Sequence, residues 1–168
     1  MVTINIAFTA PINPPSATPP LTVPQLWAGL QRKIRHAQEF VPAITACTVV
    51  SETAEGGSPG GGGDAVPVVT REAVFAEGGR VVTEVCRSYA PSRVDFHQPD
   101  GSVVSNIVSE AADGALHMTY SFSWRHPEVA AGSAEEEALR AKYRAMARMA
   151  VEKSIESIRE MVKDGRIQ

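Results

Sequence analysis

Residues 133–165 read SAEEEALRAKYRAMARMAVEKSIESIREMVKDG, and this stretch decides the fold. Ser133 and Glu136 have the spacing of a capping box, in which each side chain accepts a hydrogen bond from a backbone N–H that the helix leaves unpaired. Gly165 is a typical helix stop. At about 1.5 Å per residue, the predicted helix over residues 134–164 spans roughly 45 Å. Its apolar stripe, with helical spacing, consists of Leu139, Tyr143, Met146, Ala147, Ala150, Val151, Ser154, Ile155, Ile158, Met161 and Val162.

A helix of this length needs a broad curved surface to cover its stripe, and the residues before it alternate as strands do. Residues 2–9 alternate apolar with polar side chains, and about six more strands follow a first helix that begins at Thr22. This order predicts an α+β helix-grip fold, with a seven-stranded antiparallel sheet wrapped around a long C-terminal helix. We expect one domain over residues 1–168, with a proline-rich connector at 11–21 and a glycine-rich loop at 55–65. Such a sheet and helix enclose a cavity, so we expect an apolar small molecule as ligand or substrate.

Composition excludes several classes of function. The formal net charge is −3 and no block of Lys and Arg occurs, so we expect no nucleic-acid partner. No apolar run reaches the length of a membrane span. The first residues lack the basic start of a signal peptide, and we expect a cytoplasmic protein. Cys47 and Cys86 are therefore expected to be free, buried thiols. The histidines lack metal-ligand spacing and no dinucleotide fingerprint occurs, so we expect no metal and no cofactor. Nothing in the pattern indicates an oligomeric state.

The turn residues place the later strands in register. Asp113-Gly114 is a strong signal for a two-residue hairpin turn, and we interpret Pro99-Asp100 in the same way. Both assignments put the same apolar set on the inner face, because directly opposed residues share a face of the sheet. Asn106 then lies on the outer face. The predicted inner set consists of Val94, Phe96, Val103, Ile107, Met118, Tyr120, Phe122 and Trp124.

Two further turns extend this register upstream. Two-residue turns at Ala90-Pro91 and Gly78-Gly79 place Glu72 and Arg87 on the inner face as diagonal neighbours. A three-residue turn over residues 77–79 instead points Arg71 inward and Glu72 outward. The sequence leaves both arrangements open.

Seven stretches together carry a resemblance to a known family: Leu26-Trp27-Ala28-Gly29-Leu30, Glu39-Phe40-Val41-Pro42, Thr70-Arg71-Glu72, Pro91-Ser92-Arg93-Val94-Asp95-Phe96, Ser105-Asn106, Thr119-Tyr120-Ser121-Phe122-Ser123-Trp124-Arg125-His126-Pro127 and Lys142-Tyr143-Arg144. They resemble the AtaL-like family, first described as a domain of unknown function. That family belongs to the START/Bet v 1/polyketide-cyclase (SRPBCC) superfamily and is common in fungi. The resemblance implies a pocket protein, sometimes found beside fungal secondary-metabolite genes. It carries over no catalytic residue set.

Four residues are candidates for chemistry in the expected cavity. Glu72 beside Arg87 is the best acid/base pair, because a carboxylate on an apolar wall has a raised pKa unless a cation offsets it. The alternative is a structural ion pair at the rim, or Glu72 in solvent. Tyr120 can orient a ligand carbonyl or be a core tyrosine. His126, after Arg125 at the end of the last strand, can titrate near the cavity mouth or bond to the following loop.

Two functions from different classes remain open. The first is a cofactor-independent tailoring enzyme of fungal secondary metabolism, namely a cyclase, isomerase or dehydratase. The second is a non-catalytic carrier for an apolar metabolite. An acid or base with a perturbed pKa that faces the interior would distinguish the enzyme. The side chains expected to line the ligand are Trp27, Phe96, Ile107, Met118, Phe122, Trp124, Tyr143, Met146, Ala150 and Ser154.

Overall fold

A computed structural model of the chain describes residues 1–56 and 64–168. Its seven strands form one antiparallel sheet in the order β1-β7-β6-β5-β4-β3-β2. The elements in chain order are β1 (Val2–Pro11), α1 (Val23–Arg35), the 3-10 helix η1 (Ala37–Glu39), β2 (Ile44–Glu55), β3 (Val66–Phe75), β4 (Val81–Tyr89), β5 (Arg93–His97), β6 (Val103–Glu110), β7 (Leu116–His126) and α2 (Ala134–Lys163).

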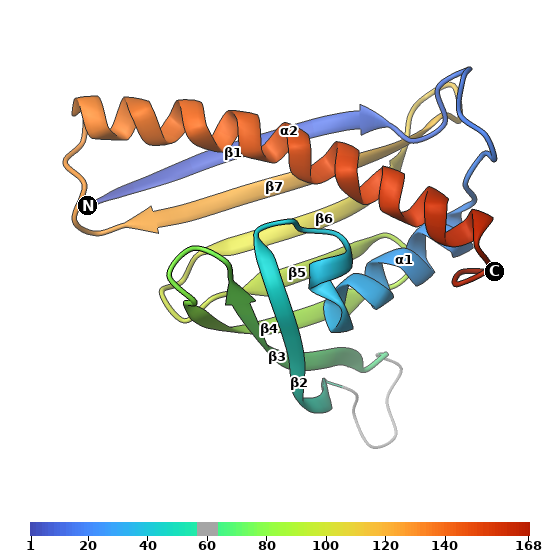
Figure 1. Cartoon of the computed structure of the whole chain (residues 1–168), viewed down its shortest axis with the longest axis horizontal. Helices are drawn as coiled ribbons and strands as arrows, with labels where there is room; N and C mark the ends of the chain where they lie inside the picture. The colour runs from blue at the N-terminus through green and yellow to red at the C-terminus, as the bar shows by residue number, and fades with distance from the viewer. Residues whose placement is uncertain (57–63) are drawn as a thin grey trace.

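The sheet curves around its helices (Figure 1). α2 lies along β1 and β7, and α1 covers the part of the same face toward β3 and β6. The predicted helix-grip fold is therefore confirmed. Most of the predicted glycine-rich loop falls at residues 57–63, which lie outside the described residues.

α2 begins and ends as the sequence predicts. The Ser133 hydroxyl accepts a hydrogen bond from the Glu136 N–H, and Gly165 follows the helix with φ of +82°. The second half of the predicted capping box is wrong, because the Glu136 carboxylate accepts from the N–H of Gly132 at 2.8 Å. The buried stripe between Ala147 and Met161 joins the main core. No helix within the described residues is long and apolar enough to cross a membrane.

α1 is set close against α2 by a glycine. Thr22 and Gln25 form a full capping box at its start. A Cβ atom at Gly29 would lie 2.5 Å from Cγ1 of Ile158 on α2, so the two backbones approach closely only because Gly29 has no side chain. This contact fixes how deeply the buried face of α1 reaches into the sheet.

The predicted register of β6 is wrong by one residue against both neighbours. The two flanking hairpins use three-residue loops, each with an Asp followed by a glycine of positive φ, Gly101 and Gly114. A three-residue hairpin loop of this kind includes a bulge. Compared with a two-residue turn, it shifts the pairing of the two strands by one residue, so that the opposite face of one strand points inward. β5 and β7 keep their predicted inner faces, whereas β6 presents Val104, Asn106 and Val108 inward. Ile107, predicted to face inward, lies on the outer face.

The two-residue turns predicted upstream are also wrong. The β4–β5 loop has three residues, and the β3–β4 loop runs over residues 76–79. Arg71 consequently pairs with Glu84 on the inner face, which is the alternative orientation that the sequence left open. Glu72 is exposed on the outer face of β3, and Arg87 also points outward, so their predicted inward placement is wrong.

Candidate functional site

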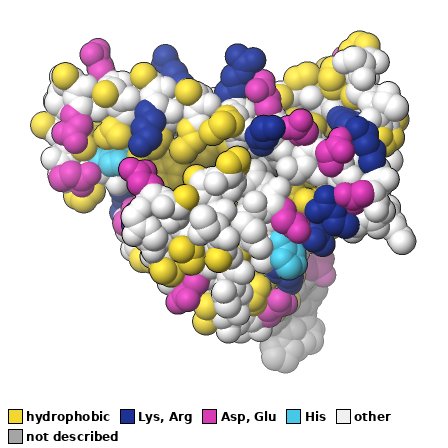
Figure 2. All heavy atoms as spheres, viewed as in Figure 1, with side chains coloured by type: hydrophobic (Ala, Val, Ile, Leu, Met, Phe, Trp, Pro, Cys, Tyr) yellow, Lys and Arg dark blue, Asp and Glu magenta, His cyan; other side chains and the backbone are white. Residues whose placement is uncertain are grey.

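An apolar cavity of about 150 Å³ lies between α2, the inner face of the sheet and the segment that leads from η1 into β2. Figure 2 shows a hollow lined by hydrophobic side chains beneath α2. An apolar cavity of about this volume can hold a single benzene ring, so the space suits a compact molecule or one ring of a larger one. Some of the residues for which the sequence predicts a role in the cavity do line it. These are Phe96, Tyr120, Phe122, Trp124, Met146 and Ala150.

A buried lysine forms the centre of the polar part of this cavity. Lys33, on α1, is only 6% exposed. Its Nζ donates hydrogen bonds to Oδ1 of Asn106 at 2.9 Å, to the Tyr120 hydroxyl at 3.0 Å and to Oγ of Ser154 at 3.4 Å. These four residues are called the polar cluster below. They come from α1, β6, β7 and α2, so the whole fold is needed to assemble them.

The environment of the polar cluster favours an amine without its proton. Burial, followed by the nearby positive charge of Arg71, lowers the pKa of Lys33 to about 7, although the Glu84 carboxylate partly opposes this. Burial raises the pKa of the Tyr120 phenol. Near neutral pH the cluster therefore combines an amine that can accept a proton with a phenol that keeps its own.

A buried ion pair holds the lysine in place. Nη2 of Arg71 lies 2.6 Å from Oε2 of Glu84, and both side chains are almost fully buried. Nη1 of Arg71 donates to the backbone carbonyls of Lys33 and Ile34, at 2.7 Å and 2.9 Å. Nε2 of Gln98 donates to the other Glu84 oxygen at 3.1 Å. Carbonyl groups in the last turn of a helix have no hydrogen-bond partner within the helix. Arg71 donates to two such carbonyls in α1 and thereby fixes the turn that carries Lys33.

Two donors on residues of the cavity wall have no hydrogen-bond partner in the part of the chain that the structure describes. Nδ2 of Asn106 and Nε1 of Trp124 are buried and donate to no acceptor among the described residues. Both residues line the cavity. A buried donor without a partner costs about 1–3 kcal/mol, and an oxygen atom of a ligand would remove that cost. The cavity is therefore apolar in most of its wall, and two of the residues that line it carry a donor without a partner among the described residues.

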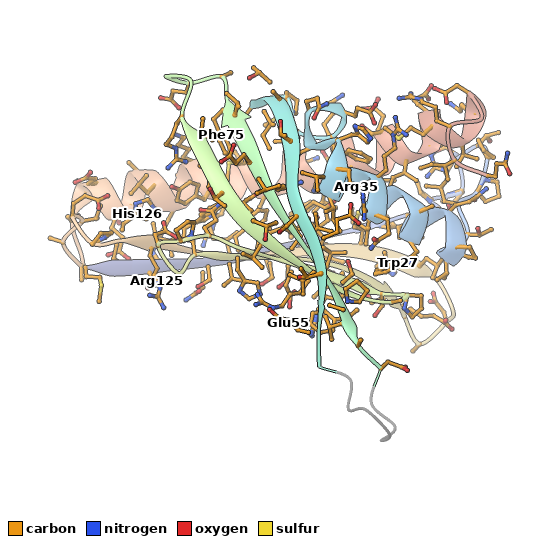
Figure 3. All side chains as sticks on the ribbon, turned by 90° about the horizontal axis from the view of Figure 1, so that it is seen from below. Trp27, Arg35, Glu55, Phe75, Arg125 and His126 are labelled. Atoms are coloured by element: carbon orange, nitrogen blue, oxygen red, sulfur yellow. The ribbon has the colours of Figure 1, made fainter. Side chains whose placement is uncertain are left out.

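Of the four predicted catalytic residues, only Tyr120 lines the cavity. Arg87 forms an ion pair with Glu55 at 2.8 Å on the outer face, and Glu72 is exposed to solvent. The ring of His126 stacks on Tyr143 and its Nε2 lies 3.0 Å from the Tyr143 hydroxyl. Figure 3 shows His126 near the end of the molecule where β7 leads toward α2.

Five of the predicted lining residues lie elsewhere. Ile107 is on the outer face, and Met118 is fully buried in the core. Trp27 packs against the core from α1, and Figure 3 shows it on the opposite side of the molecule from His126. Tyr143 lies between Trp124 and His126. Ser154 belongs to the polar cluster rather than to the apolar wall.

The sequence reasoning missed Lys33 and Glu84. Lys33 follows Leu26 by seven residues and Leu30 by three, so it lies on the buried face of its helix. A lysine in that position was the available signal, because lysine is rarely buried without a function or a partner. Glu84 alternates with two buried neighbours of β4, Val82 and Cys86, and the same argument applies to it.

Other parts of the described structure offer less for chemistry. No three His, Cys, Asp or Glu side chains within residues 1–56 and 64–168 are arranged to hold a metal ion. A larger groove of about 800 Å³ lies between the proline-rich connector and α2, but it is an open surface groove edged by charged residues such as Arg148 and Glu152. Cys47 and Cys86 are both free, as predicted, but Cys47 is only half-buried, so its predicted burial is wrong. Cys86 is buried, which raises the pKa of its thiol to about 12.

The curved sheet, the long helix and the cavity between them define a helix-grip protein. Within that class, the chain belongs to the AtaL family, described as acetylaranotin biosynthesis cluster protein L, whose profile matches residues 6–165. The resemblance expected from the sequence is thereby confirmed. No curated protein matches the sequence significantly.

Solved structures with the same fold share little sequence with the chain. The 18 kDa protein CC1736 from Caulobacter crescentus is 16% identical with a TM-score of 0.58, and the match covers 98% of this chain and 99% of that one. The di-domain ARO/CYC protein StfQ from the steffimycin biosynthetic pathway is 11% identical with a TM-score of 0.55, over 98% of this chain and 52% of that one. Ara h 8.0201 is 14% identical with a TM-score of 0.50, over 97% and 99%. These likenesses concern the fold.

Proposed function

We propose that the protein binds a compact apolar molecule in its cavity and acts on it as a cofactor-independent tailoring enzyme of fungal secondary metabolism. The observation that carries this proposal is the contact between Nζ of Lys33 and the Tyr120 hydroxyl at the polar end of an apolar cavity. The family description names a biosynthesis cluster, and StfQ comes from a biosynthetic pathway. Both support a place in secondary metabolism.

The polar cluster has the properties of an acid/base site. The amine of Lys33, with a pKa of about 7, is poised to take a proton from a substrate near neutral pH. The phenol of Tyr120 can donate a hydrogen bond or a proton to a substrate oxygen, and the free N–H groups of Asn106 and Trp124 can hold that oxygen. Cyclisation, isomerisation and dehydration next to a carbonyl all require proton transfers of this kind. A positioned acid or base contributes about 10²–10⁴-fold in rate.

A carrier is the second function that the cavity supports. Binding alone needs only the apolar wall formed by side chains such as Phe96, Phe122 and Met146. A carrier gains nothing from a buried lysine whose charged form is disfavoured, because burying that group costs stability. The polar cluster therefore favours the enzyme over the carrier.

The test is conversion of the intermediate that the neighbouring biosynthetic genes produce. We expect wild-type protein to accelerate it, and Lys33→Met and Tyr120→Phe to slow it by about 10²-fold or more. Arg87→Met is the matched control, since Arg87 lies on the outer face, and it should keep the wild-type rate. Circular dichroism and displacement of an apolar dye establish that each variant folds and still binds.

Three outcomes separate the two functions. Slow conversion by Lys33→Met and Tyr120→Phe with intact dye binding supports the enzyme. Wild-type protein that binds the intermediate without changing its rate of conversion supports the carrier. Failure of wild-type protein to bind either the dye or the intermediate contradicts the cavity as a ligand site.

A further inference from the structure

The polar cluster contains a nucleophile as well as a base. An amine with a lowered pKa in a site poor in water is the usual form of a lysine that attacks carbonyl groups. Lys33 is one of the residues that line the cavity, and no carboxylate of the described residues forms an ion pair with its Nζ. The Glu84 carboxylate, whose charge acts on Lys33, is already bound by Arg71 and Gln98.

The surroundings of Lys33 select for a ligand with an acceptor oxygen. The Tyr120 hydroxyl contacts Nζ at 3.0 Å, and the unpartnered N–H groups belong to Asn106 and Trp124. All three groups can donate a hydrogen bond to a carbonyl oxygen. The rest of the wall is apolar, and its volume of about 150 Å³ suits a ring-sized or short-chain molecule. A ketone or an aldehyde satisfies both conditions.

We propose that Lys33 forms a Schiff base with a ketone or aldehyde group of a compact apolar substrate held in this cavity. The proposal rests on the function proposed above and names the substrate class and the covalent step of the same site. Lys33 is then a catalytic residue, because its nitrogen bonds to the substrate. Arg71 is a positioning residue that acts through the last turn of α1.

The step balances without an added oxidant or reductant. The lone pair of Nζ attacks the carbonyl carbon, the C–N bond forms, and the carbonyl oxygen takes a proton from Tyr120. In the resulting carbinolamine, the nitrogen returns one proton to Tyr120 and passes its second proton to the hydroxyl group, which departs as water and leaves a neutral C=N bond. The imine nitrogen then takes up one proton from solvent. The positive iminium form lowers the pKa of the neighbouring C–H, which then gives up its proton more easily. Addition of water reverses the step and releases the lysine.

The thiols are poor competitors for this role. Cys86 is fully buried, and its pKa of about 12 keeps it protonated near neutral pH. Cys47 is half-buried on β2, where its Sγ donates to the carbonyl of Ile34 at 3.6 Å. Neither cysteine lines the cavity, so the amine of Lys33 is the nucleophile that a ligand meets there.

The experiment uses cyclohexanone and sodium cyanoborohydride with the full-length protein near neutral pH. Cyanoborohydride reduces the C=N bond and leaves a stable adduct, which peptide mass spectrometry locates. We expect the adduct on Lys33 at least about tenfold faster than on the exposed Lys142, because the cavity holds the ketone beside Lys33 and the pKa of the Lys33 amine is lowered to about 7. Lys33→Arg should remove the fast adduct, and Lys142→Arg should leave it unchanged.

Displacement of an apolar dye by cyclohexanone is measured in parallel. If the ketone displaces the dye but Lys33 is labelled no faster than Lys142, the Schiff base is overturned, and the acid/base function still stands. If the ketone neither displaces the dye nor labels Lys33, the cavity is not its site, and both proposals fail. Saturable displacement together with fast labelling of Lys33 supports both proposals.

Discussion

Removing the amine of Lys33 should change how the stability of the protein depends on pH. The folded state holds the pKa of this group at about 7, against an ordinary value of 10.5. Between these two values the unfolded chain binds more protons than the folded protein, so stability rises with pH across that window. Below pH 7 both states carry the proton, and the full cost of the buried charge remains.

The size of this effect follows from the pKa shift. From about pH 6 to about pH 9, the wild-type protein should gain about 2–3 kcal/mol in its free energy of unfolding from Lys33 alone, at about 1.36 kcal/mol per pH unit above the folded pKa. Lys33→Met leaves Asn106 Oδ1 and the Tyr120 hydroxyl without their donor, but that cost is the same at both pH values. The difference between wild type and Lys33→Met therefore isolates the titration.

Urea unfolding of the two proteins at both pH values measures the difference. Lys142→Met is the control, because Lys142 is exposed on α2 and should unfold with the wild-type pH dependence. A gap between wild type and Lys33→Met that stays constant within about 0.5 kcal/mol would refute the reasoning, since Lys33 would then titrate alike in the folded and unfolded states.

Three further variants test the packing that supports the site. Gly29→Ala should lower the free energy of unfolding by about 1–3 kcal/mol in urea, because its Cβ would lie 2.5 Å from Cγ1 of Ile158 and this overpacking outweighs the gain in helix propensity. Arg71→Met should cost about 3–5 kcal/mol by the same assay, because it leaves Glu84 buried without its partner. Ala150→Phe should fill the cavity and weaken the binding of an apolar dye by about tenfold or more, with an unchanged circular dichroism spectrum.

Arg71→Met and Ala150→Phe each have a matched control, and all three variants have a result that would contradict the reasoning. A Gly29→Ala protein as stable as wild type would mean that α1 and α2 are not in tight contact at this point. Arg87→Met removes an ion pair whose carboxylate partner is exposed, and it should cost less than about 1 kcal/mol; equal losses for Arg71 and Arg87 would contradict the buried pair. Ala141→Phe, on the exposed side of α2, should leave dye binding unchanged. A loss of dye binding in this variant would contradict the cavity as the site where the dye binds.

The helices could be predicted from the sequence because their signals are local. Ser133, Thr22 and Gly165 mark helix ends through bonds to the nearest turn, and the apolar spacing of α2 depends only on the helical period. These features led to the order of elements and hence to the fold, without any knowledge of long-range contacts.

The register of β6 could not be predicted, because its sequence fits either face. Val103-Val104 and Ile107-Val108 place an apolar residue on each side of the strand, so the burial pattern does not choose between the two. The Asp-Gly pairs favour a two-residue turn and equally a three-residue loop with glycine last. Moving β6 by one residue changes its pairing with β5 and β7 together, so the agreement between the two predicted hairpins was not an independent check.

The polar cluster could be found only in part for a related reason. Tyr120 was placed correctly because β7 has a clear alternation. Asn106 was placed on the outer face together with the wrong register of β6. The burial of Lys33 could not be predicted, because a lysine on a helix normally reaches solvent. Its burial depends on Arg71 and Glu84, which approach from strands distant in the sequence.

NMR of the methionine methyl groups tests most directly whether the cavity is the ligand site. Met146 lines the cavity, whereas Met118 and Met161 are buried in the core away from it. Titration of ¹³C-methyl-methionine protein with cyclohexanone should shift the Met146 signal in a saturable way and leave those of Met118 and Met161 in place. A Met146 signal that stays unchanged while the ketone binds would contradict the account, because binding would then take place outside the cavity that holds Lys33 and Tyr120.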